Sequence, residues 1–293
     1  MDTRHCRLPP TRHGLLLVAL LSLACSGPLP PTQLVFLTQP GRATVGTRLA
    51  PAIQLKALDA EGMPVSGVTV SLSLETNPGQ GTLSGSTTAS TNAMGIASFE
   101  GLSIDSRGMG YTLAARAEPK DARALVTVSS PFAVFLLDQQ QPSTSSEAVS
   151  AIGGESEQKL AQVVTAGSDG YLGEVALPVS CASGELRVEI RGVQGELPDG
   201  TLLASRTVPS TGLPSSDEFT RIAFPEPVAL SAGTRFAIVL SSSGDCGLRQ
   251  GPVGNPYPGG DGFFDSRPNA PGEWVPLSIG DGRSDLPFQT FLL

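Results

Sequence analysis

The chain has 293 residues, of which 40% are hydrophobic and 16% charged, and its formal net charge is −8. Nucleic acid is not an expected partner, because a polyanion is bound by clustered Lys and Arg that such an acidic chain lacks. The sequence contains no Walker-type phosphate loop and no dinucleotide fingerprint, so a nucleotide ligand is not expected either.

The first 24 residues have the layout of an export signal. Arg4, Arg7 and Arg12 precede an apolar run over residues 15–21, which is the order of charged and apolar segments in such signals. The run is too short for a membrane-spanning helix, which needs ~20 apolar residues. We therefore expect residues 1–24 to be removed and the rest of the chain to be exported.

Removal of this segment limits the chemistry of the mature chain. His5 and His13 are the only two histidines, so the mature chain would contain none. It would then lack the commonest general base and the commonest transition-metal ligand, which excludes Ser-His-Asp, Cys-His and histidine-metal sites. Because three Arg and one Asp leave with the segment, the formal net charge would fall from −8 to −10.

The end of the apolar run, Ser22-Leu23-Ala24-Cys25, resembles the lipobox of bacterial lipoproteins. The resemblance implies that Cys25 becomes the lipidated first residue of the mature chain, and Ser26 is compatible with sorting to the outer membrane. An ordinary secretory signal cut near Ala24 is the alternative. Several acyl chains would anchor the protein firmly in the membrane, at the start of a proline-rich tether over residues 25–32.

Cys181 and Cys246 remain as an even pair of cysteines in an oxidising compartment, once Cys25 is lipidated. A disulfide between them is expected, and the loop-entropy model gives it about 4 kcal/mol. Two separate buried thiols are the alternative, because the sequence does not give the distance between them. Zinc is disfavoured, since no histidine or further thiolate would complete the tetrahedron.

Strand patterns dominate the sequence from residue 33 onward and predict an all-β protein of two sandwich domains. Period-two runs of apolar and Thr residues are separated by Gly, Pro, Asn and Asp every ~8–12 residues. The first unit, residues 33–134, contains enough predicted strands for a small sandwich. These strands are 33–38, 52–58, 68–74, 82–84, 96–99, 111–117 and 124–128.

Short motifs occur along the whole of this first unit. They include Leu34-Val35-Phe36, Ala57-Leu58-Asp59, Asn77-Pro78-Gly79, Gly95-Ile96-Ala97-Ser98-Phe99 and Gly110-Tyr111-Thr112-Leu113. The series resembles the bacterial immunoglobulin-like repeats of secreted and surface proteins. The resemblance implies a Greek-key sandwich that serves as a spacer or adhesive module, without chemistry of its own. Tyr111 would be a corner tyrosine whose hydroxyl ties a loop to the backbone.

The second unit, residues 135–293, is large enough for a core of its own. A boundary is expected near residues 129–131, and residues 139–146 form a polar, low-complexity run. Only residues 155–164 permit a helical turn. The predicted strands suggest a two-sheet jelly roll, and they are 159–165, 171–179, 185–192, 202–208, 220–224, 235–241, 262–264 and 288–292.

The second unit also carries motifs of a known kind. They include Ala161-Gln162-Val163-Val164-Thr165, Leu186-Arg187-Val188-Glu189-Ile190-Arg191, Leu197-Pro198-Asp199-Gly200-Thr201, Phe236-Ala237-Ile238-Val239-Leu240 and Asn255-Pro256-Tyr257-Pro258. The series resembles an extracellular jelly-roll module at the ends of bacterial surface proteins, similar in outline to carbohydrate-binding domains. No motif fixes a ligand, so the resemblance implies more about the fold than about the function.

Trp274, the single tryptophan of the chain, marks the best candidate binding region. Sugars are commonly bound by an aromatic face together with carboxylates and amides. Tyr257, Phe263 and Phe264 lie near it in the sequence, and the polar groups that accompany it are Asp261, Asp265, Asn269 and Glu273. The alternative is that Trp274 only packs a loop onto the sandwich, since lone aromatics are mostly buried for area.

Loop aspartates form a second candidate site, for a structural calcium ion. Asp281 and Asp285, like Asp261 and Asp265, lie in glycine-rich segments, and calcium is bound by several oxygens from flexible loops. Their spacing matches no EF-hand, and solvated loop acids are the alternative. No other cofactor is expected.

Catalysis is not expected, because nothing distinguishes any carboxylate by its surroundings. Glu189 and Glu273 are arbitrary nominees for the acid pair of a glycoside hydrolase, and the alternation of residues 187–191 predicts that Glu189 faces water. The sequence therefore predicts a non-catalytic surface lipoprotein whose spacer presents a jelly roll for glycan or protein binding. A polysaccharide hydrolase and a purely structural spacer are the alternatives.

Overall fold

The computed structural model describes residues 29–120, 123–145, 148–214, 218–265, 273–279 and 282–293. This part of the chain is built of β-strands and two 3-10 turns, Gly154–Ser156 and Ser210–Gly212, which confirms the all-β prediction. The predicted signal peptide and Cys25 lie outside the described residues. Within the described part, no helix has the length and apolar character needed to cross a bilayer.

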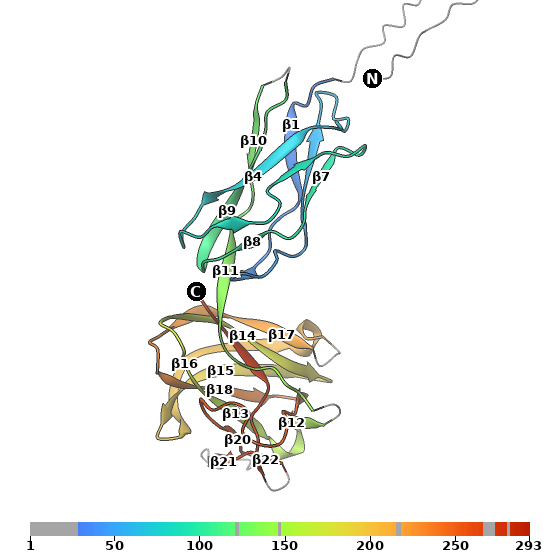
Figure 1. Ribbon diagram of the computed structural model, residues 1–293. Helices are drawn as coiled ribbons and strands as arrows, with labels where there is room; N and C mark the ends of the chain where they lie inside the picture. Colours follow the sequence, from blue (N-terminus) through green and yellow to red (C-terminus); the bar gives the residue numbers. More distant parts are fainter. Residues whose placement is uncertain (1–28, 121–122, 146–147, 215–217, 266–272, 280–281) are drawn as a thin grey trace, which may run out of the picture.

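The first unit is a small sandwich of short antiparallel strands (Figure 1). Along β3, Ile53, Leu55 and Ala57 point into the core while the residues between them are partly exposed, as strand alternation requires. One sheet has the order β1-β3-β7. The strands β10, β9, β4 and β6 face it across the shared hydrophobic core. The strands are β1 (Gln33–Thr38), β2 (Ala43–Thr44), β3 (Ile53–Leu58), β4 (Thr69–Thr76), β5 (Leu83–Ser84), β6 (Thr88–Ser90), β7 (Ile96–Phe99), β8 (Ser103–Ile104), β9 (Gly108–Ala117) and β10 (Leu125–Val128).

Tyr111 has the structural role that the resemblance implies. Its side chain is fully buried, and its hydroxyl donates a hydrogen bond of 2.9 Å to the backbone oxygen of Ser106. Gly79 lies so close to this hydroxyl and to the Arg107 backbone that a Cβ would collide with both. The turn at Gly79 therefore requires a glycine.

Strand β11 (Phe132–Gln141) joins the two units through shared hydrogen bonding. Its first residues pair with β9 and with β2 in the first unit, while two pairs of residues on either side of a register shift, Leu136-Leu137 and Gln140-Gln141, pair with β24 (Phe288–Leu292) in the second. The expected boundary near residues 129–131 lies just before this strand, and the polar run at 139–146 begins inside it. One eleven-stranded sheet therefore runs from one unit into the other (Figure 1).

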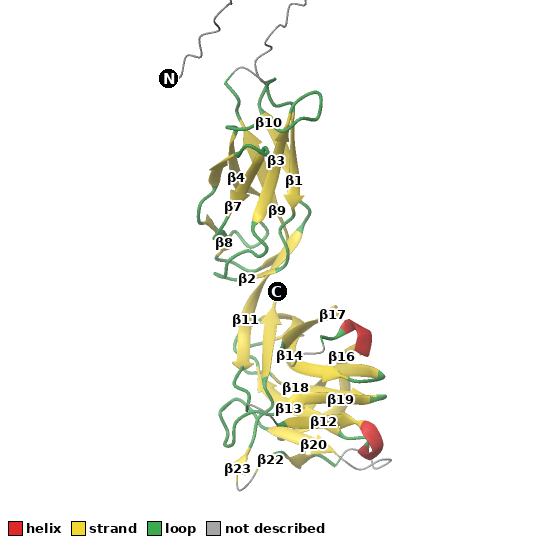
Figure 2. Cartoon of the chain, turned by 90° about the vertical axis from the view of Figure 1, so that its right-hand side faces the viewer, coloured by secondary structure: helices red, strands yellow, loops and turns green. Residues whose placement is uncertain are grey.

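The second unit is a sandwich of two sheets (Figure 2). One sheet has six strands in the order β16-β15-β18-β13-β20-β21, and β12, β19, β14, β24, β11 and β17 form the facing part of the eleven-stranded sheet. A continuous buried core lies between them, to which Val188 of β15 and Leu177 of β14 both belong. The strands are β12 (Val149–Gly153), β13 (Lys159–Thr165), β14 (Gly170–Cys181), β15 (Glu185–Gln194), β16 (Leu197–Pro209), β17 (Phe219–Leu230), β18 (Arg235–Ser242), β19 (Asp245–Arg249), β20 (Gly262–Asp265), β21 (Val275–Pro276), β22 (Ser278–Ile279), β23 (Gly282–Arg283) and β24.

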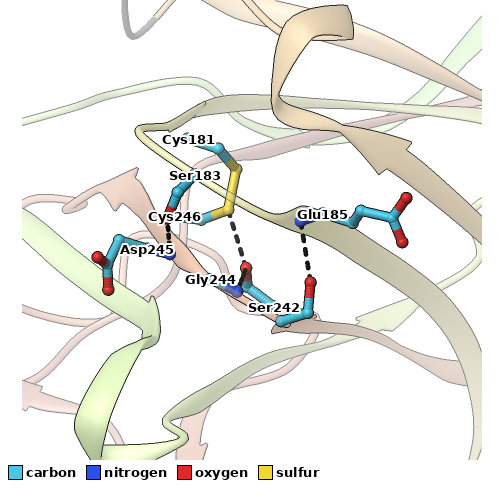
Figure 3. Close-up of a disulfide and its surroundings, with 8 residues drawn as sticks. Cys181, Ser183, Glu185, Ser242, Gly244, Asp245 and Cys246 are labelled. Carbon is cyan, nitrogen blue, oxygen red and sulfur yellow. Dashed lines mark hydrogen bonds between the residues drawn. A yellow bond between two sulfur atoms is a disulfide. The ribbon is translucent and has the colours of Figure 1, made fainter.

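Cys181 and Cys246 form a disulfide between β14 and β19 (Figure 3). The two cysteines lie directly opposite each other in register. Hydrogen bonds surround the bridge, including those from the Asp245 backbone nitrogen to Ser183 and from the Gly244 backbone nitrogen to Ser242. The predicted pairing is confirmed, and a disulfide indicates an oxidising compartment outside the cytoplasm.

Candidate functional site

The outer face of the six-stranded sheet brings several charged side chains of the second unit together. Along β15 the apolar residues between the charged ones are buried in the sandwich core. Arg187, Glu189 and Arg191 consequently lie on the opposite face, because successive residues of a strand alternate between faces. This face, and not the core side, is open to a ligand.

A row of apolar residues crosses this face of the sheet, and one of them, Val239, lines the floor of a groove. Glu189 lies opposite Val239 of β18, Val239 lies opposite Ala161 of β13, and Ala161 lies opposite Phe263 of β20. These three apolar residues belong to a separate buried cluster, against which Trp274 packs. Val239, the member of this row that lines the groove, has a short side chain, so the sheet face is low at that point.

Two walls rise beside this floor. Trp274 stands on one side, directly before β21, which pairs with β20. The β15–β16 hairpin forms the other side with Pro198, Asp199 and Gly200. Register shifts in β15 near Arg191 accompany the hairpin, and such bulges bend a strand pair. The groove between the walls, which we call the outer groove, has a volume of about 560 Å³.

Asp199 is held in place within the hairpin wall. Its Oδ1 accepts a hydrogen bond of 2.7 Å from the Thr201 backbone nitrogen. Its carboxylate lies so close to Gly192 that a Cβ on Gly192 would be 2.7 Å from Oδ1. The wall therefore presents a carboxylate in a fixed position.

Glu189 occupies the middle of the groove floor with both carboxylate oxygens engaged. The distances from Arg187 Nη2 to Oε1 and from Arg191 Nε to Oε2 are both 2.7 Å. Glu189 is only 4% exposed, so its two arginine neighbours cover it. The expectation that Glu189 faces water is therefore wrong, because alternation decides the face of a strand but not what adjacent side chains cover.

The charges that line the outer groove balance. Three cations, Lys159, Arg187 and Arg191, are matched by three carboxylates, Glu189, Asp199 and Asp265. Lys159 and Asp265 lie directly opposite each other on β13 and β20. The groove therefore offers many hydrogen-bond donors and acceptors without attracting either sign of charge.

A second hollow of about 380 Å³ adjoins the outer groove. Lys159 and Ser241 line both, and the second hollow continues along Ser243, Gly244 and Glu157. Together they form an elongated depression, which suits a chain-shaped ligand better than a compact one.

The structure brings together two of the four predicted ligand-binding residues. Trp274 and Asp265 both line the outer groove. Asp261 does not line it and forms an ion pair of 2.7 Å with Arg283. Tyr257 is 5% exposed and packs edge-on against Phe288, so its ring is part of the core.

Asp285 and Tyr257 belong to a buried polar network instead of a surface site. Asp285 accepts hydrogen bonds from Gln162 Nε2 at 2.9 Å and from the Tyr257 backbone nitrogen at 3.0 Å. Burial raises the pKa of the Asp285 carboxyl, although both hydrogen bonds oppose this shift. Burial likewise raises the pKa of the Tyr257 phenol, to about 12.

The predicted calcium pair is not brought together within the described residues. Asp281 lies outside them, and Asp285 has each oxygen in a hydrogen bond from the protein. The described residues contain no cluster of three or more His, Cys, Asp or Glu that would hold a metal ion. Calcium at Asp281 and Asp285 stays a prediction.

The remaining nominated residues add little to the groove. Asn269 lies outside the described residues, and Glu273, though next to Trp274 in sequence, is exposed and does not line the groove. Sequence reasoning missed Lys159, Arg187, Arg191 and Asp199 as groove residues. The alternation of residues on β15 indicates that Arg187 and Arg191 share a face. Only the pairing of four strands shows that Lys159 and Asp199 lie beside them.

Comparison with known proteins does not assign the chain to a family. No family model matches it, and no curated protein matches it either. A solved structure described as "Structural basis for the promiscuous specificity of the carbohydrate-binding modules from the beta-sandwich super family" is similar with a TM-score of 0.33 and 7% identity. The match covers 76% of this chain and 96% of that chain. A likeness of this size does not identify a ligand.

Proposed function

We propose that the protein is a non-catalytic, exported glycan-binding protein whose outer groove takes an uncharged polysaccharide chain. The single observation that carries the proposal is the meeting of Trp274 with balanced polar side chains around one elongated groove. An aromatic ring offers area to the apolar face of a sugar, and fixed carboxylates and guanidinium groups suit its hydroxyls. A neutral glycan is favoured over an acidic one because the lining charges cancel.

The contacts of the central carboxylate, Glu189, favour binding without turnover. Each oxygen of Glu189 is within 2.7 Å of an arginine nitrogen, and the residue is only 4% exposed, so both oxygens are engaged by the protein and covered. A glycoside hydrolase needs one carboxyl that donates its proton to the leaving group. In this proposal Glu189 instead holds Arg187 and Arg191 in position to donate hydrogen bonds to ligand hydroxyls.

The wider architecture of the proposal follows the sequence resemblances. The first unit is an immunoglobulin-like spacer, the second a jelly roll, and Cys25 carries the lipid that attaches the chain to a membrane. In the structure, the described chain begins at the end of the first unit that points away from the second (Figure 1). A tether at that end would hold the outer groove away from the membrane surface.

Affinity electrophoresis in gels that contain soluble polysaccharides tests the glycan proposal. The probes are galactan, xyloglucan and mannan as neutral chains and polygalacturonate as an acidic one. We expect at least one neutral chain to retard the protein, and Trp274→Ala to weaken that binding at least about tenfold, as loss of an aromatic anchor does. Lys159→Gln, which alters the junction of the two hollows, is expected to weaken it about fivefold.

Tyr171→Ala is the matched control, because Tyr171 is a 57% exposed aromatic of the same unit that does not line the groove. It is expected to bind like the unaltered protein. Circular dichroism would show that each variant is folded. Absence of retardation in every neutral gel, or full binding by folded Trp274→Ala, would contradict the proposal.

A further inference from the structure

A second pocket, which we call the joint pocket, lies where the two units meet. It has a volume of about 360 Å³, within the range of pockets that hold small molecules. Three arginines from three segments line it: Arg42 before β2, Arg206 on β16 and Arg221 on β17. None of its lining residues is acidic.

One carboxylate forms ion pairs with two of these arginines. Glu174 of β14 lies 2.6 Å from Arg42 Nη1 and 3.5 Å from Arg221 Nη1. Arg221 is held further by a hydrogen bond of 2.8 Å to Thr44 Oγ1 and by the ring of Phe291, whose centroid is 3.7 Å from its Cζ. The position of Arg221 is thus fixed by the protein.

Arg206 differs from the other two arginines of the joint pocket in the contacts of its guanidinium. Within the described residues it has no ion-pair or hydrogen-bond partner for its guanidinium, and it is exposed. Three guanidinium groups therefore line the joint pocket, and Glu174 pairs with two of them, Arg42 and Arg221. Burial lowers the pKa of Arg221, the nearby Glu174 carboxylate opposes this shift, and Arg42 adds a smaller lowering.

Apart from Thr220, the other side chains that line the joint pocket are apolar. Val208, Leu213, Ile222 and Phe224 contribute to its lining. An anion at the arginines would relieve their repulsion, and guanidinium binds a carboxylate through two parallel hydrogen bonds. A hydrocarbon part of the same molecule would be covered by the apolar side chains.

From these observations we propose that the joint pocket binds small carboxylates that carry an apolar body. The site is independent of the outer groove, with which it shares no residue. Since Arg42 belongs to the first unit and Arg206 and Arg221 to the second, a bound carboxylate would bridge both units.

Calorimetric titration of the full chain with benzoate tests this site, and benzamide serves as the neutral molecule of the same shape. At constant ionic strength we expect benzoate to bind at least about tenfold more tightly than benzamide, because only benzoate is charged. Arg206→Gln is expected to weaken benzoate at least about fivefold. Its folding is not at risk, since Arg206 is exposed and makes no side-chain contact that the fold requires.

Arg116→Gln is the matched control, because it removes the same charge from an exposed position on β9. It is expected to leave benzoate binding unchanged, and Lys159→Gln in the outer groove is expected to do the same. Equal binding of benzoate and benzamide, or equal benzoate binding by Arg206→Gln and Arg116→Gln, would overturn the proposal. Neither result would affect the glycan proposal, whose variants lie elsewhere.

Discussion

Burial divides the acidic residues of the second unit into groups with different roles. Asp285 is 1% exposed and organises a loop by accepting two hydrogen bonds. Glu189 is buried by its own arginine neighbours on a sheet face. Asp199 stays partly exposed and lines the outer groove. In the sequence these residues are equivalent loop or strand acids, and only their surroundings separate structure from binding.

Tyr257 gives a pH-dependent prediction at the scale of one residue. Burial raises its pKa from 10.0 to about 12, so the folded state holds the phenol proton more tightly than the unfolded chain. The stability from this group is therefore fully present below pH 10.0 and is lost as the pH rises toward about 12. Between about pH 8 and pH 11 the unaltered protein should lose about 1.4 kcal/mol more unfolding free energy than Tyr257→Phe.

Urea denaturation at the two pH values provides this measurement. Tyr257→Phe should also be less stable by about 1 kcal/mol at neutral pH, because it removes the hydrogen bonds of the hydroxyl to Gln139 and Thr165. An identical alkaline loss in both proteins would refute the role assigned to the phenol.

Two strands that the sequence did not predict, β12 and β19, extend the larger sheet of the second unit beyond β14. β12 and β19 pair with each other, and β19 pairs with β14 beside the disulfide. Both strands are short, with Ser and Gly in β12 and Gly in β19, so their local pattern is weak. Their place is fixed by the neighbouring strand and by the Cys181–Cys246 bond (Figure 3).

The disulfide allows a prediction at the scale of these elements. It closes a loop with a sequence separation of 65, for which the loop-entropy model gives about 4 kcal/mol. The double variant Cys181→Ala, Cys246→Ala should lose that unfolding free energy in guanidinium titration. Reductant should produce the same loss in the unaltered protein and none in the double variant, and a loss below about 1 kcal/mol would contradict the model.

At the scale of the whole molecule, the two units are held by more than a linker. β11 hydrogen-bonds to strands of both units, and Arg42 of the first unit pairs with Glu174 of the second. Arg107 of the first unit donates a hydrogen bond of 2.7 Å to the Asp169 backbone oxygen. The shared strand and these polar contacts therefore connect the two units along β11 and on its flanks.

The ion cluster at this joint gives a prediction about coupling. Glu174 has a side chain only 3% exposed, and burial raises its pKa despite Arg42 and Arg221. Arg221→Met should lower the unfolding free energy by about 3 kcal/mol, because it leaves a buried carboxylate with one half-exposed partner. Adding Glu174→Leu should recover most of that loss, since an apolar pair needs no charge compensation.

A double-mutant cycle by chemical denaturation measures this coupling. Losses that simply add in the double variant would contradict a direct interaction between Glu174 and Arg221. Small-angle scattering of Arg221→Met would additionally report whether the joint loosens.

The sequence predicted several strands at their observed bounds, among them β1, β7, β13 and β24. In these strands the apolar pattern and the turn residues agree. It did not predict β11, because its polar end, Gln139-Gln140-Gln141, resembles a linker. Gln140 and Gln141 pair with β24, and the Gln139 backbone nitrogen donates to Thr290 Oγ1, which a local pattern does not reveal.

What the sequence by itself determined was the all-β class, the cysteine pair and the residue types available for binding, because these follow from composition and local alternation. The tertiary structure alone decided which side chains meet. Trp274 reaches the outer groove with Asp265 and Glu189, while Tyr257 and Asp285 turn into the core. The physical reason is that strand pairing joins residues far apart in the chain, and burial then sets the charge and exposure of each group that it gathers.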